Sequence, residues 1–248
     1  MAYMKMMLSA GRRMLSTTDS SAPNPAKARL SWKPLLMVSA LLAGCSGLVS
    51  REETFEPQTI HFDSSELGQL PPGFSTALTG GGGPISWLVR EDSTAPDGKS
   101  VLVQDSSDDT SYRFPLCIYE KTRARDVAVE VSYKAISGKV DQAGGIILRY
   151  NPENYYIARA NALEDNIDLF KTVRGKRSKI EEAPVKVAAG EWHTLRFEAK
   201  GPRLKVAFDG KVVIEKDDRT FSHPGQVGLW TKADSVSAFA NLKIERAQ

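Results

Sequence analysis

The chain has 248 residues, enough for a domain with a full hydrophobic core, and a formal net charge of +3. Residues 1–44 hold six Lys and Arg side chains and one acid, which leaves 27 basic and 29 acidic side chains, a net charge of −2, in the rest of the chain. Because no strong positive field remains there, the composition argues against nucleic acid as a partner.

A short apolar run near the N-terminus has the composition of a secretory signal. Residues 34–44 read PLLMVSALLAG and follow the basic residues Lys27, Arg29 and Lys33. The run is too short for a transmembrane helix, which needs about 20 apolar residues, and it ends in the small residues typical of a cleavage site. A signal peptide is therefore predicted, with an ordinary core helix as the alternative.

The end of this run, Leu42-Ala43-Gly44-Cys45, resembles the lipobox of bacterial lipoproteins. The resemblance implies that residues 1–44 are a leader and lipoprotein signal peptide, and that Cys45 is lipidated and anchors the mature chain to a membrane. Residues 45–58 are mostly polar and are predicted to be the lipidated tether. Ser46, where an Asp would favour inner-membrane retention, implies an outer-membrane location in the bacterial cell envelope, facing the periplasm or the exterior.

Residues 59–248 are predicted to form one all-β domain. The four glycines of 80–83 predict a loop. Apolar and polar side chains then alternate in 127–133, which is the pattern of a strand with one wet face. Further strands are predicted at 169–173, 177–180, 195–199, 204–208, 212–214, 227–231 and 239–245.

Three turn signals connect these runs. Asp209-Gly210 is a strong hairpin signal because both central residues of such a turn need positive φ. Arg174-Gly175 and Gly201-Pro202 predict two further turns, and the basic cluster at 174–179 is predicted to be a solvated hairpin tip. About ten or more strands at this spacing imply a sandwich or a barrel. The predicted inward-facing residues are Val129, Val131, Leu195, Phe197, Val206 and Phe208.

The second half of the chain carries recognisable segments in order: GGIILRY from Gly144, NYYIARANALEDNIDLFK from Asn154, GEWHTLRFEAKG from Gly190, FDGKVV from Phe208 and GQVGLWTKADSVSAFANLKI from Gly225. Together they resemble the concanavalin A-like lectin/glucanase superfamily, near its laminin-G-like and 3-keto-disaccharide hydrolase domains. The resemblance implies a two-sheet antiparallel jelly-roll sandwich with one concave sheet and a ligand groove across it. Because that superfamily includes lectins, glycosidases, lyases and domains without a known ligand, the fold alone does not give the function.

Polar residues on two neighbouring strands indicate where a ligand would bind. Alternation places Tyr155, Arg159 and Asn161 on one face of their strand, where the amide and the guanidinium suit sugar hydroxyls or carboxylates. Arg149 shares that face only if the hairpin at 151–154 carries a bulge or a one-residue shift. The predicted ligand-binding residues are Arg149, Tyr155, Arg159, Asn161, Glu164, Asn166, Trp230 and Lys232. The alternatives are that the arginines pair with acids such as Glu164, Asp165 or Asp168, and that Trp230 belongs to the core.

The sequence lacks the common catalytic and metal-binding patterns. Glycosidases need two carboxylates about 5 to 10 Å apart, and the short E-x-D-x-E-type strand that superfamily glycosidases often use for them is missing. The three His residues are widely separated, so no His-based metal site is predicted, and no catalytic residue can be named. Calcium remains possible through Asp63, Asp141 and Asp234. Cys117 lies in an apolar run and is predicted to be buried and inert.

Three functions follow from these observations. The first is a lipoprotein whose groove binds a saccharide or glycan, the second a glycoside hydrolase or lyase of the 3-keto-disaccharide hydrolase type, and the third a structural envelope protein without a small ligand. The missing carboxylate pair favours the first and third over the second.

Overall fold

The structure is a computed structural model that describes residues 55–248. The predicted signal peptide, Cys45 and most of the tether lie outside the described residues. Within them the chain forms fifteen strands and no helix, which confirms the all-β prediction. Accordingly, residues 55–248 include no helix long and apolar enough to cross a membrane.

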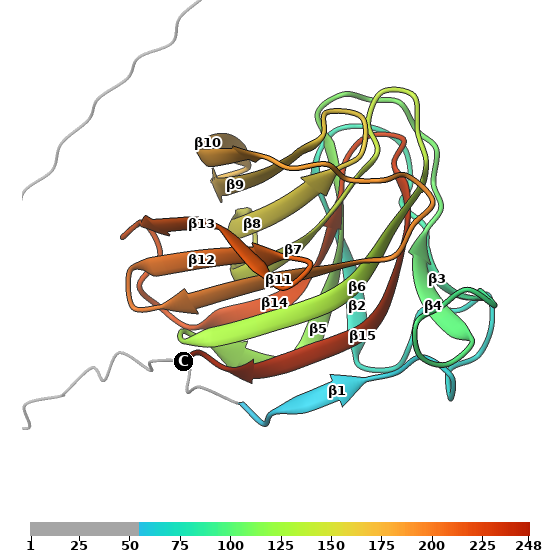
Figure 1. Cartoon of the computed structure of the whole chain (residues 1–248), viewed down its shortest axis with the longest axis horizontal. Coiled ribbons are helices and arrows are strands. Elements are labelled where there is room, and N and C mark those ends of the chain that lie inside the picture. The colour runs from blue at the N-terminus through green and yellow to red at the C-terminus, as the bar shows by residue number, and fades with distance from the viewer. Residues whose placement is uncertain (1–54) are drawn as a thin grey trace, which may run out of the picture. The chain divides into compact units, whose positions relative to one another are not determined.

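Two antiparallel sheets make up the domain (Figure 1). The strands are β1 (Gln58–Ile60), β2 (Phe74–Gly80), β3 (Trp87–Glu91), β4 (Ser100–Gln104), β5 (Arg113–Ala124), β6 (Val127–Ser137), β7 (Ala143–Asn151), β8 (Asn154–Asn161), β9 (Asn166–Val173), β10 (Lys176–Pro184), β11 (His193–Lys200), β12 (Arg203–Phe208), β13 (Lys211–Asp217), β14 (Gly225–Thr231) and β15 (Val236–Arg246). The seven-stranded sheet has the order β10-β9-β8-β7-β14-β5-β2. The eight-stranded sheet has the order β13-β12-β11-β6-β15-β4-β3, with β1 also paired to β15. The two-sheet sandwich predicted from the resemblance is therefore confirmed.

The turn signals in the sequence lie where the chain reverses. Asp209 and Gly210, with φ of 47° and 78°, connect β12 to β13. Arg174 and Gly175, with φ of 49° and 75°, connect β9 to β10, and Gly201 starts the turn between β11 and β12. Positive φ costs little for Gly and is tolerated by Asp, which explains the first of these turns.

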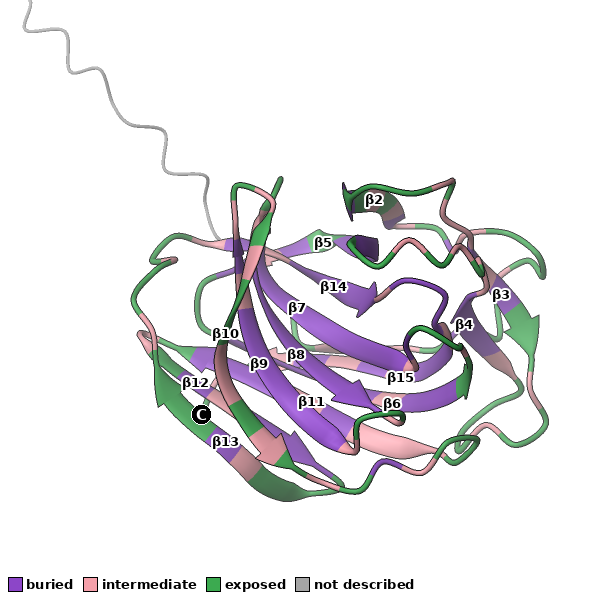
Figure 2. Ribbon diagram, turned by 90° about the horizontal axis from the view of Figure 1, so that it is seen from above, coloured by how far each residue is buried: buried purple, intermediate pink, exposed green. Residues whose placement is uncertain are grey.

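The main core lies between the two sheets. All six predicted inward-facing residues, including Val129, Phe197 and Val206, belong to it and are almost completely buried. Cys117 is buried there as a free thiol whose pKa is raised by burial, as predicted. Figure 2 shows the buried residues concentrated in the central strands, whereas the edge strands β10 and β13 are largely exposed.

The seven-stranded sheet is strongly curved, and its concave face points away from the main core. β5 and β10 are five strand spacings apart in the sheet order, which in a flat sheet would separate them by about 24 Å. Yet Tyr112, just before β5, donates its hydroxyl proton to the carbonyl of Gly175 (2.9 Å) and accepts a hydrogen bond from the Arg177 amide (2.8 Å). The face beneath this contact is therefore concave, and a second cluster that includes Phe114, Tyr155 and Trp230 fills its centre.

Candidate functional site

Charged side chains gather at one end of the concave face. The register of β8 and β9 pairs Arg159 directly with Asp168, so both side chains project from the same face. The Arg159 Nη2 donates to Glu164 Oε2 (2.7 Å), Asn166 Oδ1 (2.7 Å) and Asp168 Oδ2 (2.5 Å). From β10, Lys179 Nζ lies 3.2 Å from Asp168 Oδ1. We call the following six residues the Arg159 cluster: Arg159, Glu164, Asn166, Asp168, Lys179 and Glu182.

The cluster has a buried centre and an exposed rim. The side chains of Arg159 and Asp168 are 2% and 1% exposed, whereas those of Glu164, Lys179 and Glu182 are 48%, 44% and 47% exposed. Lys179 forms an ion pair with Glu182. A ligand arriving from solvent would therefore meet the rim carboxylates and the ammonium first.

A second group of polar residues adjoins the cluster. Asp141 is buried, accepts a hydrogen bond from Asn161 Nδ2 (3.0 Å) and forms an ion pair with Lys232. Asn161 also accepts a hydrogen bond at its Oδ1 from the Glu164 amide (3.3 Å), which links this group to the Arg159 cluster. Among the predicted site residues, Arg159, Asn161, Glu164, Asn166 and Lys232 are thus brought together.

The carboxyl groups of the cluster differ in their pKa. Burial raises the pKa of Asp168, and the opposing charges of Arg159 and Lys179 do not fully offset this effect. Burial also acts on Glu164, but the charge and hydrogen bond of Arg159 outweigh it and lower the pKa of Glu164. The hydrogen bond from Lys179 lowers the pKa of Glu182. The rim therefore carries ionised carboxylates at neutral pH.

Several buried polar atoms on this face have no hydrogen-bond partner among the described residues. They include Arg159 Nε, Thr172 Oγ1, Arg177 Nη1 and Trp230 Nε1. Asp168 Oδ1 also accepts no well-aligned hydrogen bond, despite the Lys179 ammonium at 3.2 Å. Leaving a buried donor or acceptor unsatisfied costs about 1–3 kcal/mol, so water or a ligand with hydroxyl groups would complete these interactions.

The centre of the concave face differs from the open groove that was expected. Trp230 and Tyr155 are fully buried: Trp230 stacks on Phe114 with ring centroids 5.4 Å apart, and Tyr155 donates a hydrogen bond to Thr79 (2.9 Å). The Arg177 guanidinium lies 4.6 Å from the Phe114 ring centroid and 5.6 Å from that of Trp230. Neither Trp230 nor Tyr155 presents a free ring to solvent, because the aromatic residues and Arg177 fill the groove here.

Arg149 does not join the site. The β7–β8 register shifts by one residue, which was the condition for Arg149 to share a face with Arg159. The irregularity, however, lies between Leu148 and Asn151 and gives Arg149 itself a φ of 54°. Arg149 lies near the Asn151 end of β7, far from the Arg159 cluster, and this left-handed backbone turns its side chain away from the concave face. There it contacts Tyr156, which faces the main core, and donates hydrogen bonds to backbone carbonyls. The predicted role of Arg149 in the groove is therefore wrong.

The predicted calcium ligands are engaged by donors within the protein. Asp63 accepts hydrogen bonds from the amides of Lys99 and Ser100, and Asp234 accepts them from three successive amides that begin at Lys139. Asp141 is held by Lys232 and Asn161. Within residues 55–248, no group of three or more His, Cys, Asp or Glu side chains is arranged to hold a metal ion. The described side chains therefore form no carboxylate cluster for calcium, and a site built from an Asp and loop carbonyls stays a prediction.

Comparison with known proteins relates this geometry to carbohydrate chemistry. The profile of the 3-keto-alpha-glucoside-1,2-lyase-like domain matches residues 78–245, a range that includes the whole Arg159 cluster. The chain belongs to this family. Its fold is that of the concanavalin A-like superfamily, as the sequence segments had indicated.

Two relatives are informative. Over 132 residues, 52% of this chain, the sequence is 30% identical to the levanase of Bacillus subtilis (strain 168), and the match spans 19% of the levanase. The structure resembles the carbohydrate-binding module CBM66 from Bacillus subtilis with a TM-score of 0.55 and 25% identity, covering 70% of this chain and 95% of the module. The domain is therefore similar to carbohydrate-binding modules and glycoside hydrolase domains.

Four members of the site were not predicted as ligand-binding residues: Asp141, Asp168, Lys179 and Glu182. For Asp168 a signal was present, because a hairpin that pairs Asn161 with Asn166 sets Arg159 opposite Asp168. Arg177 was predicted to be solvated with the rest of the 174–179 tip. That prediction is wrong for Arg177. It lies opposite Thr172 in the β9–β10 register, and both side chains point to the concave face, where the Arg177 guanidinium lies over the Phe170 ring. For Asp141 the sequence held no signal, since a loop residue has no periodicity.

Proposed function

We propose that this chain is a lipid-anchored protein of a bacterial envelope, and that its jelly-roll domain binds a neutral saccharide at the Arg159 cluster. The observation that carries the proposal is a buried polar cluster whose donors and acceptors are only partly paired. A sugar offers several hydroxyl groups, each both a donor and an acceptor, and so matches such a mixed surface.

The charge balance favours a neutral ligand. The cluster and its neighbours contain four cations, Arg159, Arg177, Lys179 and Lys232, and four acids, Asp141, Glu164, Asp168 and Glu182. Arg159 and Lys179 both pair with Asp168, and Lys232 pairs with Asp141. A charged ligand would add an uncompensated charge to a partly desolvated site, which is costly. The likeness to a carbohydrate-binding module supports the same ligand class.

An enzymatic function is the second candidate, as a glycoside hydrolase or lyase. The family match supports it, and so do two carboxyl groups that share Arg159 but have pKa values shifted in opposite directions. Asp168, whose pKa is raised by burial, is 1% exposed and bonded to Arg159, so a substrate reaches this carboxyl group only after the cluster rearranges. This burial makes binding the better-supported function.

The envelope location rests on the sequence alone. The apolar run before Cys45 and the short polar tether support lipid anchoring. A domain held at a membrane by a lipid would be close to glycans of the envelope or its surroundings.

The test is a binding screen with matched variants. The full-length protein is applied to a panel of neutral and acidic oligosaccharides, and hits are quantified by calorimetry. Glu164→Gln removes one rim charge without emptying the buried centre, and we expect it to weaken binding roughly tenfold, as loss of a charged hydrogen bond does. Glu215→Gln, an exposed glutamate of β13 paired with Arg203, is the control and should bind like the wild type. Absence of any neutral glycan ligand, or equal affinity for both variants, would contradict the proposal, and turnover of 3-keto-glycosides would favour the enzyme.

A further inference from the structure

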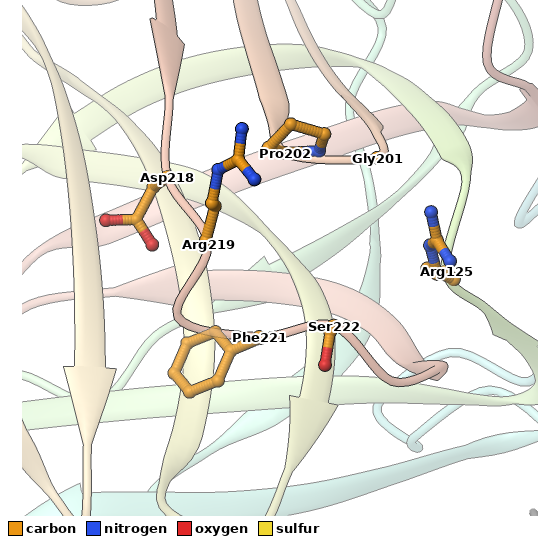
Figure 3. Close-up of a pocket in the computed structure, with 7 residues that line it drawn as sticks. All are labelled: Arg125, Gly201, Pro202, Asp218, Arg219, Phe221 and Ser222. Atoms are coloured by element: carbon orange, nitrogen blue, oxygen red, sulfur yellow. The ribbon is translucent and has the colours of Figure 1, made fainter.

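A separate pocket lies at the opposite end of β8. It has a volume of about 220 Å³ and is drawn in Figure 3. Tyr156, which lies below it, accepts a hydrogen bond from the Phe221 amide (3.1 Å). Tyr156 and Asn161 are five residues apart on the strand, or about 17 Å, so the pocket is distinct from the Arg159 cluster. We call it the Phe221 pocket, and its lining residues are Arg125, Gly201, Pro202, Asp218, Arg219, Phe221 and Ser222.

Arg149 ties the walls of this pocket together. Its guanidinium is 1% exposed and donates to the carbonyls of Arg125 (2.8 Å), Phe221 (2.6 Å) and Gly201 (2.7 Å). All three acceptors belong to lining residues, which come from three different connections between strands. At Gly225 a Cβ atom would lie 2.2 Å from the Arg149 carbonyl carbon, so only glycine permits this approach. The pocket is therefore held in shape before any ligand arrives, which reduces the entropic cost of binding.

The pocket has a positive charge. Arg125 and Arg219 are both exposed, and in Figure 3 they stand on opposite sides of the pocket. Within residues 55–248 Arg219 has neither an ion pair nor a hydrogen bond from its guanidinium. Asp218 is the lining acid; burial opposes its ionisation, but hydrogen bonds from Lys171, Thr220 and Tyr156 lower its pKa to about 2. Because Lys171 already neutralises Asp218 at 2.7 Å, the charge of Arg219 remains uncompensated.

The pocket also offers flat apolar surfaces. The Phe221 ring is held edge-on against Tyr156 with centroids 4.8 Å apart, and Pro202 forms part of the wall near Arg219 (Figure 3). Aromatic and proline rings pack well against the face of a sugar ring, and a guanidinium binds a carboxylate through two parallel hydrogen bonds.

We propose that the Phe221 pocket binds the carboxylate-bearing ring of an acidic saccharide. Arg219 receives the carboxylate, with Arg125 on the other side, while Phe221 and Pro202 contact the ring. This ligand class differs from the neutral saccharide of the Arg159 cluster, so the domain has two glycan sites of different charge preference at opposite ends of one strand.

The test compares three probes on the full-length protein: D-glucuronate, D-glucose and inorganic phosphate. We expect glucuronate to bind, its affinity to fall with ionic strength, and glucose to bind at least tenfold more weakly. Arg219→Ala should weaken glucuronate binding roughly tenfold or more, as the loss of a charged hydrogen-bond donor predicts. Arg90→Ala, an arginine of β3 at the edge of the eight-stranded sheet opposite to β13, is the matched control and should leave the affinity within about twofold of wild type, since that side chain is remote from the pocket.

The outcomes separate this proposal from the first. Glucose binding that is as tight as that of glucuronate and equally weakened by Arg219→Ala, or a wild-type glucuronate affinity in Arg219→Ala, would overturn it. Phosphate binding as tight as that of glucuronate would show that the pocket is a simple anion site and does not recognise a saccharide. Glu164→Gln should not alter glucuronate binding. If neutral saccharides do not bind at the Arg159 cluster, that result therefore does not count for or against the Phe221 pocket.

Discussion

Replacing Arg159 by alanine tests the buried ion pair at the centre of the proposed site. The side chain is 2% exposed, and its partner Asp168 is 1% exposed and 2.5 Å away. Removing one member of a buried ion pair costs about 3–5 kcal/mol because the other charge is left uncompensated. Lys179 remains 3.2 Å from Asp168 and still offsets part of its charge, so we expect the lower end, about 3 kcal/mol. This is a large share of the total stability of about 5–15 kcal/mol typical of a domain.

The stability is measured by urea denaturation of the wild type, Arg159→Ala and the double variant Arg159→Ala/Asp168→Asn. The double variant should recover much of the loss, because it no longer buries an unpaired carboxylate. Asp168 already has a raised pKa in the folded protein. Since Arg159 lowers this pKa, its removal should raise the pKa of Asp168 further, and the defect of Arg159→Ala should shrink as the pH falls through the pKa of Asp168 in the variant. A loss below about 1 kcal/mol, the scale of an exposed pair, or no recovery in the double variant, would refute the reasoning.

Three further predictions concern the core, the acid stability and the anchor. Phe197→Ala should lower the free energy of unfolding by about 3–5 kcal/mol in chemical denaturation, since Phe197 is fully buried between the sheets; a loss below about 1 kcal/mol would show that it packs less tightly. Asp218 has a folded pKa of about 2, so its stabilising contribution is complete above the ordinary aspartate pKa and is lost as the pH falls toward 2. The melting temperature of Asp218→Asn should accordingly depend less on pH in this range, and an unchanged acid profile would contradict this. Cys45→Ser should yield an unlipidated or uncleaved protein by mass spectrometry, whereas a wild-type chain with a mature N-terminus elsewhere and no acyl group would contradict the lipobox.

The fold was accessible from the sequence because its signals are local. Val129 and Val131, or Phe197 and its neighbours, alternate with polar residues and so report which face of a strand meets the core. Asp209-Gly210 reports a hairpin because few other pairs adopt two positive φ angles. These signals need no knowledge of the partner strand, which is why they correctly predicted β6, β11, β12 and β13.

The site was only partly accessible because it depends on register and curvature. Arg159 and Asn161 were correctly placed on one face, but Arg149 was misplaced because the irregularity in β7 falls on that residue. Trp230 and Tyr155 are covered because Tyr112 brings β5 and β10 together and Arg177 fills the space between them. Such a contact between strands five positions apart in a sheet has no signature in the alternation of any single strand.

The central claim is that the Arg159 cluster binds a neutral saccharide. Its most direct test is calorimetric titration of a neutral oligosaccharide into the wild-type protein and into Glu164→Gln and Glu215→Gln. The account predicts saturable binding by the wild type and by Glu215→Gln, with affinity roughly tenfold weaker for Glu164→Gln. Equal affinities for all three proteins, or no binding of neutral glycans by the wild type, would contradict it.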